Sequence, residues 1–147
     1  MKTFYTKSIR PLLVVFTFIL LASSCSKKSD PDPLDQYVGS WTETTLNGQA
    51  DTGDDLTISK SGTTLTLRDF LANDFTATLS GSGIQADNKN INTGATYTFT
   101  DNTKGVIYLK NLTGSVSGDK LTLKYTFYSE SATKYITVDF TEVFVKK

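Results

Sequence analysis

The stretch Leu121-Thr122-Leu123-Lys124-Tyr125-Thr126-Phe127 alternates strictly between apolar and polar side chains. Successive side chains of a β-strand point to opposite faces, so the four apolar residues share one face and the three polar residues share the other. This is the pattern of a strand that buries one face and wets the other. The stretch therefore predicts an antiparallel sheet that packs on one side only.

The same alternation recurs along the chain, with short turn signals such as Asn47-Gly48 and Ser61-Gly62 between the runs. No stretch beyond the first 36 residues shows sustained helical periodicity. We expect about eight strands, at residues 39–46, 54–60, 63–70, 74–80, 95–100, 105–112, 119–128 and 134–145, with a short ninth strand within 84–94 as an option. Short connections favour pairing in chain order. This predicts an all-β fold, a small antiparallel up-and-down barrel, with a β-sandwich as the alternative.

The N-terminus is composed like a targeting segment. Three basic residues precede an apolar run of 11 residues (12–22), which is followed by two serines and the only cysteine, Cys25. This order predicts a signal peptide over residues 1–24, and the run is much shorter than the ~20 residues of a spanning helix. An ordinary secretory signal with an incidental cysteine is the alternative.

The segment after the signal, residues 25–36, is polar and contains proline, which predicts a flexible tether. Fully extended, it would hold the domain about 35–40 Å from the membrane. Residues 37–147 then form the folded domain, which has no cysteine and therefore no internal disulfide. Without the signal, 12 basic and 15 acidic residues remain, a net charge of −3 with no basic stripe. This balance predicts that the protein does not bind nucleic acid.

Two short motifs carry a family resemblance. Leu21-Ala22-Ser23-Ser24-Cys25 resembles the lipobox of bacterial lipoproteins, where the signal is cut before a cysteine that then carries lipid. Gly39-Ser40-Trp41, at the start of the first expected strand, resembles the Gly-x-Trp signature of lipocalins. Together with the tether and the expected hairpin at residues 117–123, these motifs are similar to lipocalin-like lipoproteins of the Bacteroidota.

The resemblance implies that Cys25 carries lipid, including palmitate. Through this anchor, the membrane would be a binding partner of the protein. It implies a lipocalin-like barrel over residues 37–147, with Gly39 and Trp41 forming a structural plug at one end. In the wider family an arginine of the last strand covers this tryptophan. Here Lys146 or Lys147 is the nearest cation. Ser26 after the lipid site favours the outer membrane, facing either the periplasm or the surface.

The residue types present argue against an enzyme. The chain has no histidine, the commonest general base and metal ligand, and an acylated Cys25 is no nucleophile. A carboxylate pair that hydrolyses glycosides is the alternative. Asp51, Asp54 and Asp55 cluster in a Gly-containing loop, but their spacing matches no calcium loop, so we expect no metal and no cofactor.

Glu142 is the acid whose position raises a question. It shares the alternation phase of the apolar residues around it and would then point inward, where a carboxylate contacts a ligand. We favour instead a β-bulge near residue 141, after which Val143 and Val145 face inward, or a position at the barrel rim. Asp69 follows two inward leucines in the same way, and a rim position is expected there because its strand is ending.

Aromatic side chains offer the remaining candidate contacts. Tyr125 and Phe127, with Glu142, are the candidate ligand-binding residues, although aromatic residues also commonly fill the interior of an eight-stranded barrel. The sequence therefore favours a non-catalytic binding or accessory module in the outer membrane, for a small apolar ligand or an envelope protein. The alternative is a structural or interaction β domain of an envelope assembly, with no small-molecule ligand.

Overall fold

The computed structural model describes residues 30–51, 53, 55–86 and 90–147. Its folded unit runs from Asp32 to Lys147. The expected signal peptide and Cys25 lie outside the described residues. Within the described ranges, no helix has the length and apolar character needed to cross a membrane.

The folded unit consists almost entirely of strands. A short 3-10 helix, η1 (Asp35–Tyr37), precedes β1 (Gly39–Leu46), β2 (Gln49–Ala50), β3 (Asp55–Ser61), β4 (Thr64–Phe70), β5 (Asn73–Ser80), β6 (Gly83–Ala86), β7 (Asn90–Thr98), β8 (Lys104–Ser117), β9 (Lys120–Glu130) and β10 (Tyr135–Lys146).

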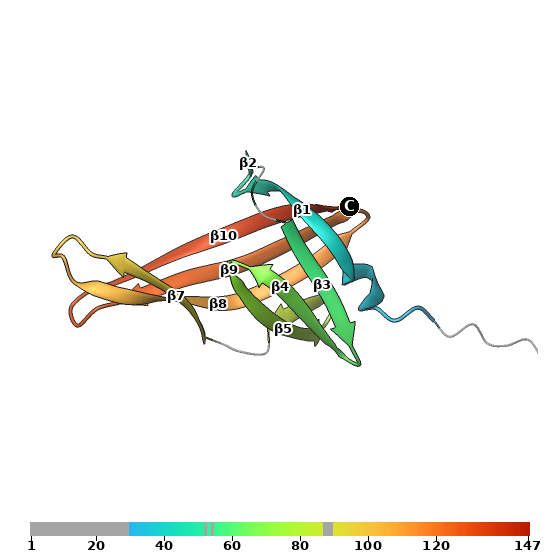
Figure 1. Cartoon of the computed structure of the whole chain (residues 1–147), viewed down its shortest axis with the longest axis horizontal. Helices are drawn as coiled ribbons and strands as arrows, with labels where there is room; N and C mark the ends of the chain where they lie inside the picture. The colour runs from blue at the N-terminus through green and yellow to red at the C-terminus, as the bar shows by residue number, and fades with distance from the viewer. Residues whose placement is uncertain (1–29, 52, 54, 87–89) are drawn as a thin grey trace, which may run out of the picture. The chain divides into compact units, whose positions relative to one another are not determined.

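Eight of the strands form a closed antiparallel barrel. Its order is β1-β3-β4-β5-β6-β8-β9-β10, and β10 closes the ring by pairing with β1 (Figure 1). Strands β2 and β7 lie outside the ring, where β2 pairs with β1 and β7 pairs with β8. The expected all-β up-and-down barrel is confirmed, and the sandwich alternative is wrong. Closure pairs the edges that an open sheet would expose.

Three barrel strands continue beyond the ring and form an arm. We define the arm as residues 90–98 of β7, 104–110 of β8, 125–130 of β9 and 135–141 of β10, which pair in that order. The arm projects from the barrel on the side away from η1 and the C-terminus (Figure 1). The barrel therefore has one end that the arm extends and one end that carries the chain termini of the folded unit.

One strand assignment from the sequence is wrong. Residues 95–100 were expected in the ring, but β6 takes that place and residues 95–98 belong to β7 in the arm. The cause is an irregularity in β8, where Asn111 has a φ of 56° and the register with β9 shifts between Lys110 and Thr113. This break lets the outer half of β8 pair with β7 and its inner half pair with β6.

The expected tether is shorter than residues 25–36. Leu34 is buried in the core, and Asp32 and Asp35 both form ion pairs with the Lys60 ammonium, the first at 2.9 Å. Residues 32–36 therefore pack on the barrel. Residues 26–31 would span only about 20 Å when fully extended, which would keep a lipid-anchored domain close to the membrane.

Candidate binding site at the mouth of the barrel

Trp41 closes the end of the barrel that lies opposite the arm. Its side chain is completely buried, and its Nε1 donates a hydrogen bond of 2.9 Å to the carbonyl of Tyr37. The Lys146 ammonium lies 5.1 Å from the centre of the indole, in cation–π range. Gly39 has a φ of 134°, and a Cβ there would stand 3.2 Å from Cε of Lys146. Glycine thus leaves room for the lysine stem beside the plug.

Aromatic rings line the opposite end of the barrel, where the arm begins. Tyr125 stacks on Phe140 with ring centres 5.3 Å apart, and it also contacts Phe127 at 5.2 Å and Phe70 at 5.6 Å. Phe127 and Phe140 are 4.9 Å apart. These four rings come from β4, β9 and β10, so tertiary folding brings them together. We call this group the aromatic mouth.

Glu142 lies beside the aromatic mouth and points into the barrel. It is 5% exposed, and its Oε1 accepts a hydrogen bond from the Tyr125 hydroxyl. The pairing of β10 with β9 is unbroken from residue 135 to 145, so the bulge that we favoured near residue 141 is not present. The register shift lies instead in β1, between Glu43 and Thr45, and β10 keeps its phase. The structure therefore joins Tyr125, Phe127 and Glu142 in one site.

A second inward carboxylate, Glu43, was missed in the sequence. It is 7% exposed, and Gly53 of the following loop lies against its carboxylate. The alternation of the first strand could have revealed it, since Gly39, Trp41 and Glu43 are two residues apart and therefore share one face. The mouth thus combines aromatic rings with two buried acids.

Burial and the two acids together raise the pKa of Tyr125. Burial raises the pKa of the Tyr125 phenol above its ordinary value, and the hydrogen bond to Glu142 and the negative charges of Glu142 and Glu43 raise this pKa further. Tyr125 therefore stays protonated and remains a hydrogen-bond donor across the physiological pH range. The Tyr125 hydroxyl thus holds the Glu142 carboxylate in place beside the aromatic mouth.

The raised pKa of Tyr125 predicts a loss of stability at alkaline pH. Above the ordinary tyrosine pKa of about 10, the unfolded chain releases the phenol proton and the folded chain keeps it. The free energy of unfolding should then fall by up to about 1.4 kcal/mol per pH unit from this group. Tyr125→Phe removes this titrating group. The amount by which the free energy of unfolding of the parent chain exceeds that of the variant should therefore shrink above about pH 10. Urea unfolding of both proteins across this pH range measures the difference, and a difference that does not change with pH would contradict the prediction.

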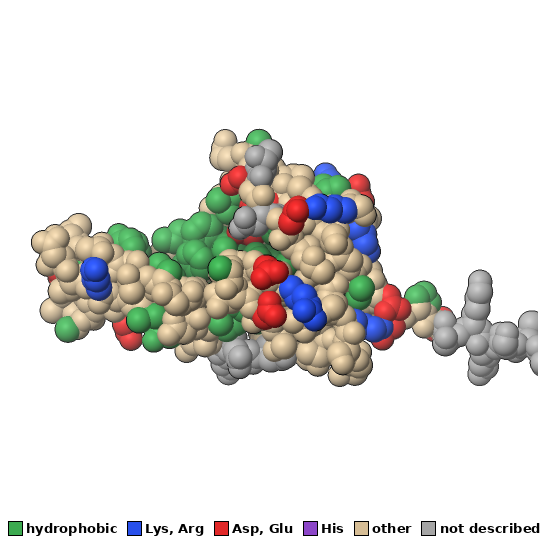
Figure 2. Space-filling view, viewed as in Figure 1, with side chains coloured by type: hydrophobic (Ala, Val, Ile, Leu, Met, Phe, Trp, Pro, Cys, Tyr) green, Lys and Arg blue, Asp and Glu red, His purple; other side chains and the backbone are tan. Residues whose placement is uncertain are grey.

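The apolar face of the arm continues the aromatic mouth outwards. A pocket of about 90 Å³ lies on this face, lined by Tyr97, Ile107, Phe127, Tyr128, Ser129, Ile136, Val138 and Phe140. Figure 2 shows hydrophobic side chains gathered over the arm and in the hollow where the arm meets the barrel. We call this continuous surface, from the aromatic mouth to the pocket, the trough. Exposed apolar patches of this kind commonly mark binding sites.

The opposite face of the arm is more polar, although it carries several tyrosines, and one of them, Tyr128, also lines the pocket. The Lys110 ammonium lies 3.5 Å from the centre of the Tyr128 ring, and the Tyr128 hydroxyl donates a hydrogen bond to Glu130. Tyr108 pairs with Tyr128 on this same face. The arm therefore has one face suited to water and one suited to an apolar partner.

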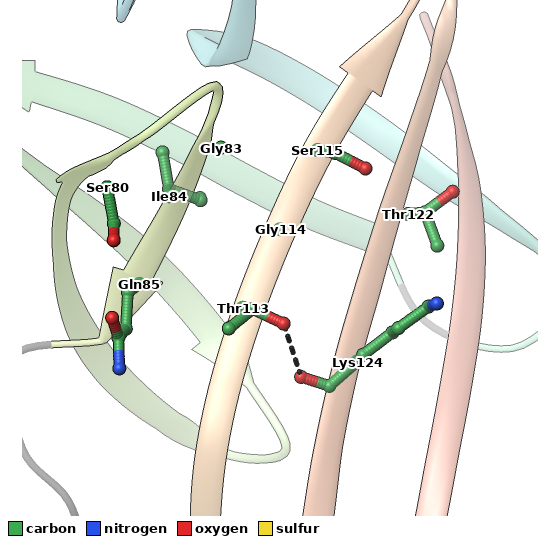
Figure 3. Close-up of a pocket in the computed structure, with 9 residues that line it drawn as sticks. All are labelled: Ser80, Gly83, Ile84, Gln85, Thr113, Gly114, Ser115, Thr122 and Lys124. Carbon is green, nitrogen blue, oxygen red and sulfur yellow. Dashed lines mark hydrogen bonds between the residues drawn. The ribbon is translucent and has the colours of Figure 1, made fainter.

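A second pocket lies on the outside of the barrel, between β6 and β8 (Figure 3). It has a volume of about 230 Å³ and is lined by Ser80, Gly83, Ile84, Gln85, Thr113, Gly114, Ser115, Thr122 and Lys124. The strands come close here, because a Cβ on Gly83 would stand 2.6 Å from the carbonyl of Gly114. Six of its nine lining residues are polar and none is aromatic, so it offers less than the trough to an apolar ligand.

Asp51, one of the other acidic residues considered in the sequence, lies near Glu43, because a Cβ on Gly53 would contact the carboxylates of both. Asp55, the first residue of β3, pairs with the Lys147 ammonium at 2.6 Å, and Asp54 is outside the described residues. Asp69 is exposed at a register shift near the end of β4 and has a φ of 58°. No group of three metal-ligating side chains occurs among the residues that the structure describes.

Comparison of the chain with protein-family models, with curated proteins and with solved structures finds no match. Function must therefore be inferred from the site itself.

Proposed function

We propose that this protein is a lipid-anchored, non-catalytic binding module of the cell envelope that holds an apolar ligand in its trough. The observation that supports this proposal is the continuous apolar surface from Tyr125 and Phe140 out to Val138, on an arm whose other face is more polar. Barrel folding alone does not require such a surface, because the interior of the ring is already filled by its own side chains.

The proposed location rests on the sequence motifs. The lipobox-like segment ending at Cys25 supports a lipid anchor, and Ser26 supports the outer membrane. The Gly-x-Trp segment and the buried Trp41 support a relationship to lipocalin-like lipoproteins of the Bacteroidota. A short tether is compatible with an anchored domain whose arm points away from the anchored end.

The geometry favours a ligand that lies along the trough. Pockets that enclose small ligands commonly hold about 300–1,000 Å³, whereas the apolar pocket of the arm holds about 90 Å³. Such a pocket can take one end or one branch of an apolar molecule while the remainder follows the aromatic side chains. We therefore propose that the expected small apolar ligand binds along an open surface and not inside an enclosed cavity.

Two other functions have support from particular observations. The trough also suits a purely structural contact with an envelope protein. The inward acids Glu43 and Glu142 are the pair that a carboxylate hydrolase would need. We place the hydrolase last because both acids are more than nine-tenths buried and Glu142 is engaged by Tyr125.

Phe127→Ala tests the proposed function. The variant removes a ring from the middle of the trough, so the dissociation constant for the neutral fluorophore N-phenyl-1-naphthylamine should rise about 10–100-fold. Fluorescence titration of residues 26–147, a chain that keeps the whole folded unit, measures this constant. Tyr108→Ala, an aromatic deletion on the polar face, serves as the matched control and should leave the affinity unchanged.

Two outcomes would contradict the proposal. One is a parent chain that does not bind the fluorophore or compete for apolar compounds. The other is equal loss of affinity in Phe127→Ala and Tyr108→Ala, which would place the binding elsewhere.

A further inference from the structure

The arm leaves one side of β10 without a neighbouring strand. Along residues 135–145, β10 pairs with β9 on one side. On its other side it pairs with β1 only from Glu142 to Lys146. Within the described part of the chain, Tyr135–Thr141 therefore has no strand partner on this second side.

The unpaired groups of this edge can be identified from the alternation of the strand. Thr141 donates its N–H to the Asn47 side-chain oxygen at 2.8 Å and accepts from the Asn47 N–H at 2.7 Å. Asn47 thus ends the edge at residue 141. Because every second residue directs its backbone groups to the same side, Tyr135, Thr137 and Asp139 present their N–H and C=O groups outwards.

This edge lacks the devices that commonly protect exposed strands. The edge strand β7, on the other side of the arm, has a register shift between Asn92 and Thr96, with Gly94 at a φ of 77°. By contrast, β10 has an unbroken register and neither proline nor lysine over residues 135–141. A regular edge without a bulge, proline or lysine is a template for pairing with another strand.

Two of the four exposed large apolar side chains among the described residues belong to this segment, on opposite faces of the strand. Tyr135 is 75% exposed and Val138 is 42% exposed, and both rank among the most exposed large apolar side chains described. The one charged residue of the segment, Asp139, accepts a 2.7 Å hydrogen bond from Thr126 on β9. Its carboxylate is therefore held over the polar face of the arm.

We propose that this edge is the interface of a homodimer, in which β10 of one protomer pairs antiparallel with β10 of its partner around a two-fold axis at Thr137. This register uses the three outward-facing residues, since Thr137 pairs with itself and Tyr135 pairs with the partner's Asp139. On the apolar face, Ile136 lies opposite the partner's Val138. An axis at Asp139 would instead place two carboxylates opposite each other, a destabilising arrangement.

The dimer joins the two arms into one continuous sheet of eight strands. The two-fold axis is perpendicular to this sheet, so the apolar faces of both arms lie on the same side. The interface is formed by backbone groups of β10, and the side chains of Ile136 and Val138, which line the trough pocket, meet across it. Dimer formation is not part of the proposed function, and the experiments below detect it without any ligand.

Disulfide cross-linking of the full chain in membranes tests the register. Directly opposed residues of a hydrogen-bonded antiparallel pair have Cα atoms about 5.5 Å apart, within the range of a disulfide. Under mild oxidation, T137C should run as a dimer on a non-reducing gel. The parent chain controls for cross-linking through Cys25, and S82C controls for random collision, because Ser82 lies in the exposed turn between β5 and β6. Cross-linking of T137C no greater than in both controls would overturn the proposal.

A second variant pair tests the backbone hydrogen bonds. T137P removes the outward N–H in both copies and should raise the dimer dissociation constant about tenfold or more. T137V keeps the N–H and should remain dimeric. Light scattering of the purified full chain in detergent measures the mass, and circular dichroism verifies folding. A monomeric parent chain, or T137P as dimeric as the parent, would overturn the proposal.

Discussion

Trp41→Ala is expected to lower the free energy of unfolding by about 3–5 kcal/mol, the range for deleting a large buried aromatic side chain. The indole is completely buried, and the variant would lose its hydrogen bond to Tyr37 and its contact with Lys146. It would also leave a cavity at the closed end of the barrel. Because domains have a total stability of about 5–15 kcal/mol, a loss of this size is severe.

Denaturant unfolding measures this loss, and Trp41→Phe is the matched control. Phenylalanine keeps most of the apolar volume but cannot donate the Nε1 hydrogen bond, so its cost should be clearly smaller. The parent chain offers an independent check, since Trp41 is its only tryptophan. A buried indole gives blue-shifted emission that iodide quenches poorly. Water-like emission with free quenching would argue against the plug.

Cys25→Ala is expected to have the largest effect on localisation. If Cys25 carries the lipid anchor, the variant should either leave the membrane fraction or remain as an uncleaved precursor. The folded unit begins at Asp32, so its stability should not change. This separates loss of the anchor from loss of the fold.

Membrane fractionation and intact-protein mass spectrometry together test the anchor. The parent chain should fractionate with membranes and show the mass of a lipid-modified protein that starts at Cys25. A Ser24→Ala variant, which changes the adjacent residue and keeps the cysteine, should behave like the parent. Unchanged fractionation and mature mass in Cys25→Ala would exclude the lipoprotein assignment.

The barrel was predictable from the sequence because period-2 alternation is a local property. The run from Leu121 to Phe127 and the corresponding runs in β1, β3, β4 and β5 each bury one face, and the burial pattern follows from geometry alone. Short turns then favour pairing of neighbours. The resemblance to lipocalins, and not the alternation, implied the burial of Trp41 and its contact with a cation at the end of the last strand, Lys146 or Lys147. Trp41 is buried, and the cation is Lys146.

The irregular positions were not predictable, because their conformation depends on partners far along the chain. At Asn111 a left-handed residue shifts the register of β8, which divides this strand between β6 in the ring and β7 in the arm. At Asp69 a similar shift turns Phe70 inward, where it contacts Tyr125. The local alternation does not indicate at which residue of such a strand the side chains switch from one face of the sheet to the other.

The sequence by itself therefore determined the strand content and the direction of most side chains, since both follow from the two-residue repeat of a strand, whereas the plug was implied by the resemblance to lipocalins. Tertiary structure decided that Glu142 stays inward, because the unbroken pairing with β9 outweighs the cost of burying a carboxylate when Tyr125 donates a hydrogen bond to it. It also decided that β8, β9 and β10 extend past the ring. The length of a strand reflects the neighbours available to satisfy its backbone groups, and those neighbours exist only in the folded chain.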